Sequence, residues 1–484
     1  MFKNLESMKT VNKHLIKNTA IFALSNFSSK IAVVVLVPIY TYKLTPEEYG
    51  IFDIIYSSIL LLFPILSCNI VDGVARFLLD NEHERNQINT IGFLFILISC
   101  IIVCALCFIL YAFKFIHEIL AYSCDVIYLY VSYALYTYLT QIAKGDDNAK
   151  VIAIASLLSS IQLIIYTLLF LFVINLGVRA ILVGTALSFA VTDLYLFLKL
   201  KIRINFHNIN HKIQYEMLAY STPIICTGIG WWINSYADKY ILTFFAGLTA
   251  TGLLTVGYKI PQVLSTFLFI FIQAWQISAI KEYKKSGYKK LYTDNFDYLM
   301  SIASIVCSIL ILLNKPIVGI LFSDEYFNCY IFIPYLLVSS VFSYAAGYFG
   351  PILSAQKNSK AMALSAIYGS IINIVFNFAL IFYMGPIGVA ISTMLSSIII
   401  FIVRYSYAKT DLLASCIIRS YFVWTLLIVQ ATIESYKVSF SYIFEILLLL
   451  SIVIINHRIY IFIVSKICIF IFKLLKKIKE AISL

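Results

Sequence analysis

The feature that most constrains this chain is a succession of apolar stretches, most of them about 20 residues or longer, with short polar connections between them. Of the 484 residues, 61% are hydrophobic and only 12% are charged. A soluble domain cannot bury so much apolar surface, whereas lipid solvates it. The sequence therefore predicts an all-α polytopic membrane protein.

About fourteen transmembrane helices are expected, since about 20 apolar residues in a helix cross the hydrocarbon core. A following apolar segment, 459–475, carries Lys466 and ends in a lysine cluster, so we expect it to lie at the membrane surface. The fourteen predicted spans are 15–41, 52–76, 88–112, 118–143, 151–174, 179–199, 217–246, 252–280, 295–322, 328–355, 361–384, 387–408, 412–433 and 439–456.

The distribution of the 36 Lys and Arg residues predicts the orientation. Most of them precede the first span, follow the last one, or fall in every second connection. Because cytoplasmic connections are enriched in Lys and Arg, both termini are expected in the cytoplasm. The basic residues left in the other connections are Lys43, Lys114, Arg179, Lys315 and Lys437.

The longest polar connection, 200–215, separates six predicted spans from the next six. At one constant offset Gly177 aligns with Gly385, Thr185 with Thr393, and further identities follow, including Asn26 with Asn234. We expect two six-helix bundles, 1–210 and 211–410, around a central cavity against which they can rock. Residues 411–484 would then form two extra helices and a basic cytoplasmic tail.

Several charges lie inside apolar stretches, namely Lys30, Asp238, Lys239 and Lys259. A charge at bilayer depth costs about 2.5–3.5 kcal/mol on insertion scales, so it usually faces a watery cavity or a partner. We interpret Lys30, Lys239 and Lys259 as a cationic cavity for an anionic substrate. The alternative is that each charge belongs to a structural pair between helices.

Acidic residues suggest ion coupling or charge pairing. Asp72 and Arg76 are four residues apart and can pair along a helix. Asp238 would keep Lys239 charged or exchange with it, and Asp53 lies near the outer end of the second span. H⁺ and Na⁺ both remain open as coupling ions.

Further polar residues have simpler interpretations. Arg419 is expected to extend its charge to the inner surface, and Asp193 and Asp297 to lie at the interface. Residues expected to contact a glycan are Asn26, Trp231, Trp232 and Asn234.

The sequence offers no catalytic or metal-binding pattern. The ten cysteines and six histidines show no metal-ligand spacing, and no phosphate-cradling glycine loop is present. No enzymatic activity, cofactor or metal is predicted. The net charge of +12 is explained by the basic cytoplasmic connections, so no nucleic-acid partner is expected.

Four segments give the chain a family resemblance. They are 36–53, with Thr45-Pro-Glu-Glu-Tyr-Gly, 238–259, from Asp238-Lys-Tyr to Gly257-Tyr-Lys, the connection 354–362, and 373–393 with its asparagines and glycines. The chain resembles the Wzx-type O-antigen and capsule flippases of the MATE-like MOP transporter superfamily. That family usually has Arg at the position of Lys239, and the exchange keeps the charge but loses bidentate geometry toward phosphate.

The resemblance implies an undecaprenyl-diphosphate-linked oligosaccharide as substrate, moved across a bacterial cytoplasmic (inner) membrane by alternating access for O-antigen or capsule assembly. It also implies lipid contacts and partnership with a glycan polymerase and chain-length proteins. Three alternatives remain open: a MATE-type ion-coupled drug antiporter, a peptidoglycan-precursor flippase, and a membrane-embedded glycan polymerase or ligase.

Overall fold

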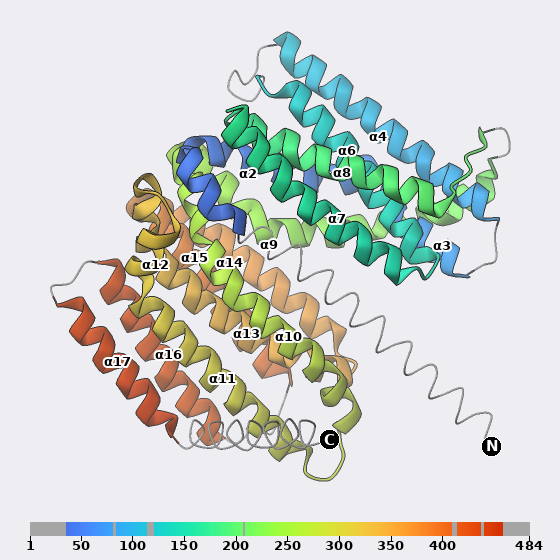
Figure 1. Cartoon of the computed structure of the whole chain (residues 1–484). Coiled ribbons are helices and arrows are strands. Elements are labelled where there is room, and N and C mark those ends of the chain that lie inside the picture. Colours follow the sequence, from blue (N-terminus) through green and yellow to red (C-terminus); the bar gives the residue numbers. More distant parts are fainter. Residues whose placement is uncertain are drawn as a thin grey trace, which may run out of the picture. The chain divides into compact units, whose positions relative to one another are not determined.

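The computed structural model describes residues 35–80, 84–113, 121–206, 209–408, 414–436 and 440–457. All regular secondary structure in these ranges is helical (Figure 1). Within them, 10 helices are long and apolar enough to cross a membrane. The predicted all-α, multi-pass membrane class is confirmed.

Contacts between residues divide the chain into two compact units. Unit 1 comprises Met1–Tyr240 and Leu248–Gly252, and unit 2 comprises Ile241–Gly247 and Leu253–Leu484. The division therefore runs through the middle of a long helical segment. The three predicted domains stay a prediction.

Helix α2 of unit 1 begins after a turn whose sequence favours helix initiation. Thr45 forms a capping box with Glu48, and Pro46 occupies the first helical position, where its missing N–H costs nothing. The helices are α2 (Pro46–Leu66), α3 (Ile70–Asp80), α4 (Arg85–Phe113), α6 (Ser123–Gly145), α7 (Ala149–Leu168), α8 (Val178–Leu200) and the first part of α9 (His211–Gly257).

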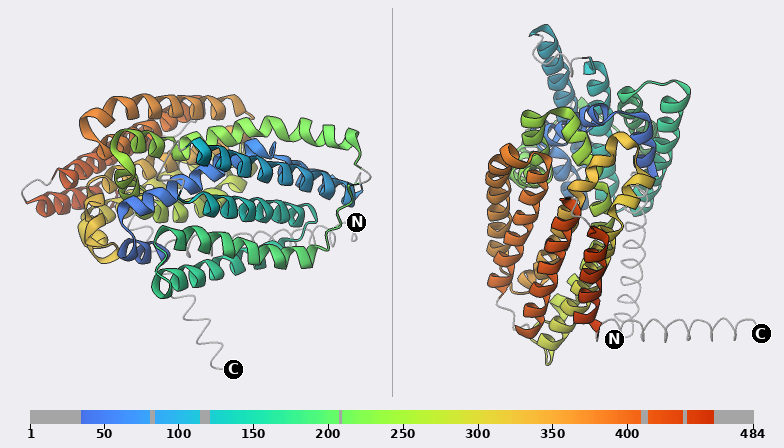
Figure 2. Two further views of the ribbon diagram at one scale, coloured as in Figure 1. Left: turned by 90° about the horizontal axis from the view of Figure 1, so that it is seen from above. Right: turned by 90° about the vertical axis from the view of Figure 1, so that its left-hand side faces the viewer.

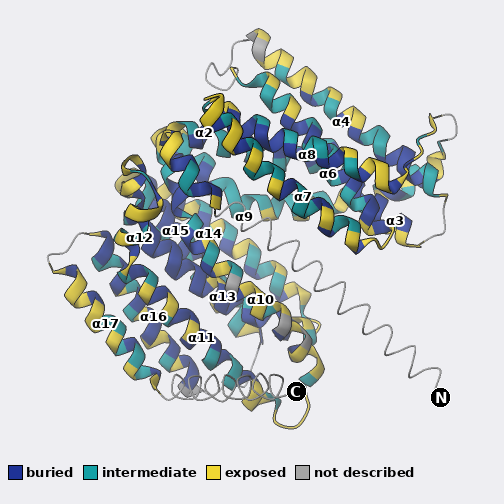
Figure 3. Cartoon of the chain, viewed as in Figure 1, coloured by how far each residue is buried: buried dark blue, intermediate teal, exposed yellow. Residues whose placement is uncertain are grey.

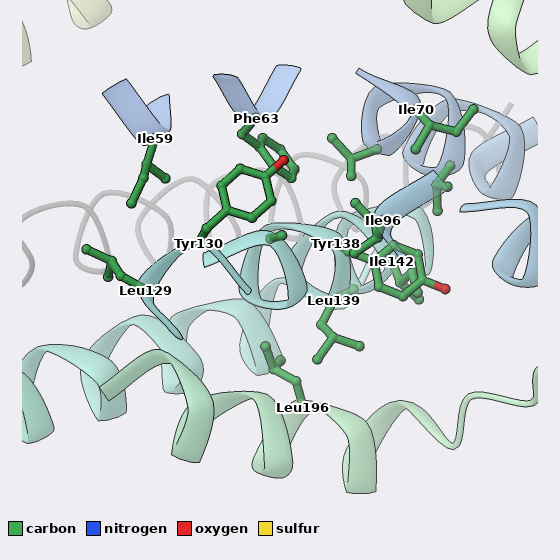
Figure 4. Packing of buried hydrophobic residues seen from close by; sticks show 14 of the residues in the cluster. Ile59, Phe63, Ile70, Ile96, Leu129, Tyr130, Tyr138, Leu139, Ile142 and Leu196 are labelled. Carbon is green, nitrogen blue, oxygen red and sulfur yellow. The ribbon is translucent and has the colours of Figure 1, made fainter. Parts of the chain in front are cut away.

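The core of unit 1 lies among α2, α3, α4, α6 and α8. Figure 4 shows Tyr130 of α6 beside Phe63 and Tyr138 of α6 beside Ile96, while Leu139 of the same helix lies toward Leu196. Tyr138 also donates its hydroxyl hydrogen bond to the carbonyl oxygen of Asn89, at 2.7 Å. The core thus holds α6 in the centre of the unit.

Unit 2 is built around α13 (Ile333–Ala355), most of whose length is buried (Figure 3). α13 contacts α10, α11, α15 and α16, and α14 packs along α15 (Figure 2). The other elements are α10 (Lys259–Glu282), α11 (Tyr288–Leu312), α12 (Asn314–Leu321), η3 (Asp324–Ile331), α14 (Ser359–Met384), α15 (Pro386–Ala408), α16 (Ala414–Ser435) and α17 (Ser441–Ile455).

Two turns in unit 1 each have a counterpart in unit 2 with similar backbone geometry. Gly177, before α8, has φ 58° and ψ −133°, and Gly385, before α15, has φ 54° and ψ −133°. Asn148 and Asn358 both cap the following helix by accepting a backbone N–H three residues on. Because unrelated turns rarely match so closely, these angles support the predicted internal repeat.

Some predicted spans have different boundaries. The expected span 52–76 is divided into α2 and α3, because Cys68 and Asn69 adopt left-handed conformations with φ 51° and 48°. The expected span 295–322 is divided at Leu313, between α11 and α12. Segment 459–475 and most of the first span lie outside the described residues.

Candidate functional site

One face of α9 carries Trp232 and Lys239, two of the residues predicted to be functional, together with Tyr236 and Tyr240. Trp232, Tyr236, Lys239 and Tyr240 follow the spacing of a helical stripe, so their side chains lie on one side of the helix. Within unit 1 this stripe contacts α2. The residues of α2 that it meets include Asp53 and Ser57, which are four apart and share a face.

Lys239 and Asp53 form an ion pair at the centre of this contact. The Lys239 Nζ atom lies 3.0 Å from Asp53 Oδ1 and 2.8 Å from Oδ2, so it donates to both carboxylate oxygens. The side chains are only 9% and 13% exposed. The Lys239 Nζ atom also lies 5.2 Å from the centre of the Tyr236 ring, within cation–π range.

Hydroxyl and indole groups extend the polar contact along the two helices. The Tyr240 hydroxyl lies 3.1 Å from Ser57 Oγ and 2.7 Å from Ser58 Oγ. The Trp232 indole N–H donates to the Ser57 carbonyl oxygen at 2.8 Å. We call Asp53, Ser57, Ser58, Trp232, Tyr236, Lys239 and Tyr240 the α2–α9 seam.

Burying the Lys239–Asp53 ion pair has a free-energy cost. Removing both groups from water carries a desolvation cost that the pair's attraction only partly offsets, whereas breaking such a pair by deleting one partner costs about 3–5 kcal/mol. The cost of burying the pair makes it a candidate functional element.

The neighbouring residues of α9 have different surroundings. Asp238 is 5% exposed, and its Oδ1 accepts the backbone N–H of Lys239. Trp231 is 61% exposed, while the Asn234 amide donates to the Gly230 carbonyl oxygen. Trp231 and Asn234 are thus accessible in unit 1, and their predicted contact with a glycan stays a prediction.

The predicted pairing of Asp72 with Arg76 is wrong. Arg76 pairs instead with Asp80, at 2.9 Å on the exposed side of α3. Asp72 accepts hydrogen bonds from the amides of Asn69, at 2.7 Å, and Gln141, at 3.0 Å. Helical spacing allowed either Asp72 or Asp80 as the partner of Arg76, and the packing of α3 on α6 decides between them.

The three predicted cavity lysines have different outcomes. Lys239 is paired in unit 1, Lys259 begins α10 in unit 2, and Lys30 lies outside the described residues, as does Asn26. A common cavity for the three lysines stays a prediction. Beside Lys259, the Tyr258 hydroxyl lies 3.3 Å from Thr393 Oγ1.

Arg404 of α15 is a cation that the sequence analysis missed. Its Nε donates to Ser365 Oγ at 3.0 Å and its Nη1 to the Ala346 carbonyl oxygen at 3.2 Å, both neutral groups. Sequence alone placed Arg404 with the basic connection that follows α15. Its position within a mostly apolar helix was the signal that could have identified it.

The expected positions of Arg419, Asp193 and Asp297 near the membrane surface stay predictions. Arg419 forms an ion pair with Asp297 of the neighbouring helix α11. Asp193 is only 7% exposed, on the wall of a pocket of about 360 Å³ lined mainly by apolar residues. Within the described residues, no group of three or more His, Cys, Asp or Glu side chains could hold a metal ion.

Solved structures share the fold of this chain. A multidrug resistance MATE family transporter of the MOP superfamily, in its inward-facing conformation, is 16% identical, with a TM-score of 0.64 over 83% of this chain and 95% of that one. The lipid II flippase MurJ, in an inward closed conformation, is also 16% identical, with a TM-score of 0.63 over 92% and 98%. A MOP superfamily transporter from Pyrococcus furiosus gives 16% identity and a TM-score of 0.55 over 84% and 96%.

At this identity the structural likeness establishes the fold alone: an all-helical, multi-pass membrane fold of the MOP type. No curated protein sequence matches the chain. A family model described as polysaccharide biosynthesis protein matches residues 15–277, more than half of the chain and including the α2–α9 seam. The chain therefore belongs to the polysaccharide biosynthesis protein family.

Proposed function

We propose that this protein is a flippase for undecaprenyl-diphosphate-linked oligosaccharide units. It would move them across a bacterial cytoplasmic membrane during assembly of a surface polysaccharide, O-antigen or capsule. Membership of the polysaccharide biosynthesis family supports the pathway, and the shared MOP fold supports a transport role. A glycan polymerase and chain-length proteins would be its partners.

The proposal also specifies the number of membrane spans, their grouping into bundles and the side of the membrane on which the termini lie. About fourteen spans would form six-helix bundles from 1–210 and 211–410 around a central cavity, with two extra helices from 411–484. Both termini would be cytoplasmic. Rocking of the two bundles would alternate access while the prenyl tail stays in lipid.

The observation that carries the proposal is the buried Lys239–Asp53 pair. A diphosphate brings negative charge that needs a cation, and Lys239 supplies one whose charge Asp53 already balances. In the proposed cycle the diphosphate replaces Asp53 as the partner of the ammonium. The released Asp53 carboxylate then takes up H⁺ or Na⁺, which would couple transport to an ion gradient.

Aromatic and amide groups near the pair suit the glycan. Sugars are recognised by hydrogen bonds together with the flat faces of aromatic rings, and Trp231 and Asn234 offer both from an accessible face of α9. Trp232 is less available, because its indole N–H already donates to Ser57. Arg404 and Lys259 are further candidate cations for the phosphates in unit 2.

The test is a comparison of Lys239→Ala with Arg76→Ala in cells that depend on this protein for their surface polysaccharide. Losing a charge-assisted contact costs about 1.5–3 kcal/mol, so we expect transport to fall about 10- to 150-fold. Lipid-linked units should accumulate on the cytoplasmic side. Arg76→Ala removes an exposed ion pair from the same unit and should transport normally.

The same cells separate the alternatives. Normal polysaccharide in the Lys239→Ala strain, with the protein present in the membrane, contradicts the proposal. Loss of drug resistance without loss of polysaccharide would identify a drug antiporter. Inviability of the deletion strain in the absence of any polysaccharide pathway would identify a peptidoglycan-precursor flippase.

A further inference from the structure

A second group of buried charges lies in unit 2, where α16 ends and α17 begins. Glu434 is in the last turn of α16 and Glu445 is near the start of α17. Both residues are 0% exposed. The proposed transport function uses neither of them.

Glu434 has a cationic partner. The Lys315 Nζ atom, from α12, lies 2.7 Å from Glu434 Oε2. The same ammonium lies 5.4 Å from the centre of the Tyr330 ring and 5.5 Å from that of Tyr442. The charges of Lys315 and Glu434 therefore neutralise each other. The single positive charge of Lys315 cannot neutralise a second carboxylate as well.

Glu445 has no donor of its own. Neither of its carboxylate oxygens has a hydrogen-bond donor among the described residues. Among the described residues, the charged groups that act on it are Glu434 from α16 and Lys315 from α12, and none comes from α11, which also packs against α17. Two ionised carboxylates are both acceptors, so a hydrogen bond between them requires a proton.

Asn314 gives an independent indication. Its side chain is directed at the carboxyl pair, because Nδ2 lies 3.4 Å from Glu434 Oε1 while donating to the Tyr330 carbonyl oxygen at 2.7 Å. Its Oδ1 is buried and also lacks a donor in the described part of the chain. Three buried oxygens therefore lack a donor among the described residues: both carboxylate oxygens of Glu445 and the amide oxygen of Asn314. Each can accept a hydrogen bond, so a positively charged species would complement them.

We propose that Glu434 and Glu445 bind one proton between them and form a proton-binding site where the C-terminal helices α16 and α17 meet. One proton makes the group electrically neutral, since Lys315 balances the other carboxylate. A metal cation would be repelled by the Lys315 ammonium, whereas a proton enters a covalent O–H bond and supplies the missing donor. The site is independent of the identity of the transported lipid.

The test is infrared spectroscopy of the purified full-length protein in lipid nanodiscs during a pH titration. At neutral pH the wild-type protein should show the carbonyl stretch of a protonated carboxylic acid, and raising the pH should remove it. Glu445→Gln should abolish this band, because a glutamine amide replaces the acid O–H as donor to Glu434. Glu325→Gln, at an exposed glutamate of η3, is the matched control and should keep the band.

A second variant keeps the test decisive if Glu445→Gln does not fold. Glu434→Gln leaves a single carboxylate beside Lys315, which needs no proton, so this variant should lose the band as well. Absence of the band from the wild-type protein at neutral pH, or its persistence in both variants, would overturn the proposal. Sodium-dependent thermal stabilisation that Glu445→Gln abolishes, without any acid band, would overturn it in favour of a sodium site.

Thermal unfolding provides an independent measurement. The folded protein would hold a proton that an unfolded glutamate, with a pKa of about 4.3, releases at neutral pH. Because the folded state then binds more protons than the unfolded state, stability falls as the pH rises. The unfolding temperature of the wild-type protein should therefore decrease with pH more steeply than that of Glu445→Gln, and equal slopes would contradict the proposal.

Discussion

At the scale of single residues, the informative observation is which partner each buried charge has. Lys239 contacts a carboxylate 186 positions away in the sequence, whereas Arg76 pairs with a residue one turn along its own helix. The first pair is buried and the second is exposed. A local exposed pair contributes a few tenths of a kcal/mol, so changes to the long-range pair should have the larger effect on stability.

Variants of the Lys239–Asp53 pair separate its structural role from its transport role. Asp53→Asn leaves a buried ammonium without its counter-charge and should lower the free energy of unfolding by about 3–5 kcal/mol. The double variant Asp53→Asn/Lys239→Gln removes both charges and should recover most of that stability. It should nevertheless transport poorly, because the proposed diphosphate partner at position 239 has lost its charge.

The measurements are denaturant unfolding in detergent for stability and accumulation of lipid-linked units for transport. Full transport by the double variant would show that the pair has only a structural role. A double variant as unstable as Asp53→Asn would show that the two charges do not stabilise each other.

At the scale of helices, the glycines that precede α8 and α15 determine how each helix begins. Their backbone angles, with positive φ and ψ near −133°, lie in a region that side chains exclude. Gly385 directly follows the end of α14, whereas Gly177 comes four residues after the helical segment that continues α7, and each glycine directly precedes a helix that packs against its predecessor. The predicted repeat would therefore include turn geometry as well as sequence.

Replacing either glycine should cost a similar amount of stability. A residue forced into such a conformation costs about 1–3 kcal/mol, so Gly177→Ala and Gly385→Ala should each lower the free energy of unfolding by that amount. A methyl group at Gly385 meets no atom within 4 Å, so its cost is purely conformational. Gly319→Ala, in α12 with ordinary backbone angles, is the control and should be close to neutral.

At the scale of the whole molecule, the distribution of basic residues predicts which connections face the cytoplasm. The capped turn before α2 is expected on the outer side, and the turn between α13 and α14 on the inner side. Both turns have exposed residues, Glu47 and Lys360. This predicted topology can be measured directly.

Cysteine labelling in intact cells measures the topology. In a chain whose native cysteines are replaced, Glu47→Cys should react with a membrane-impermeant maleimide added outside. Lys360→Cys should react only after the cells are permeabilised. The reverse pattern would invert the predicted orientation, and labelling of both sites from outside would show that the number of spans between them is wrong.

The sequence by itself determined that this is a helical membrane protein, where most of its helices lie, and which charges are unusual. Apolar length and helical periodicity are local properties, so neighbouring residues suffice to predict them. The sequence did not predict the breaks after α2 and α11, because each depends on one or two residues in special conformations.

Only the tertiary structure decided the partners of the charges. Spacing along α9 placed Lys239 within the membrane, yet Asp53, Asp238 and solvent were all compatible with that spacing. The packing of α9 on α2 selects Asp53, and in the same way the packing of α16 on α17 brings Glu434 and Glu445 together. Contacts between segments distant in sequence arise from how whole helices pack, and no local pattern records that packing.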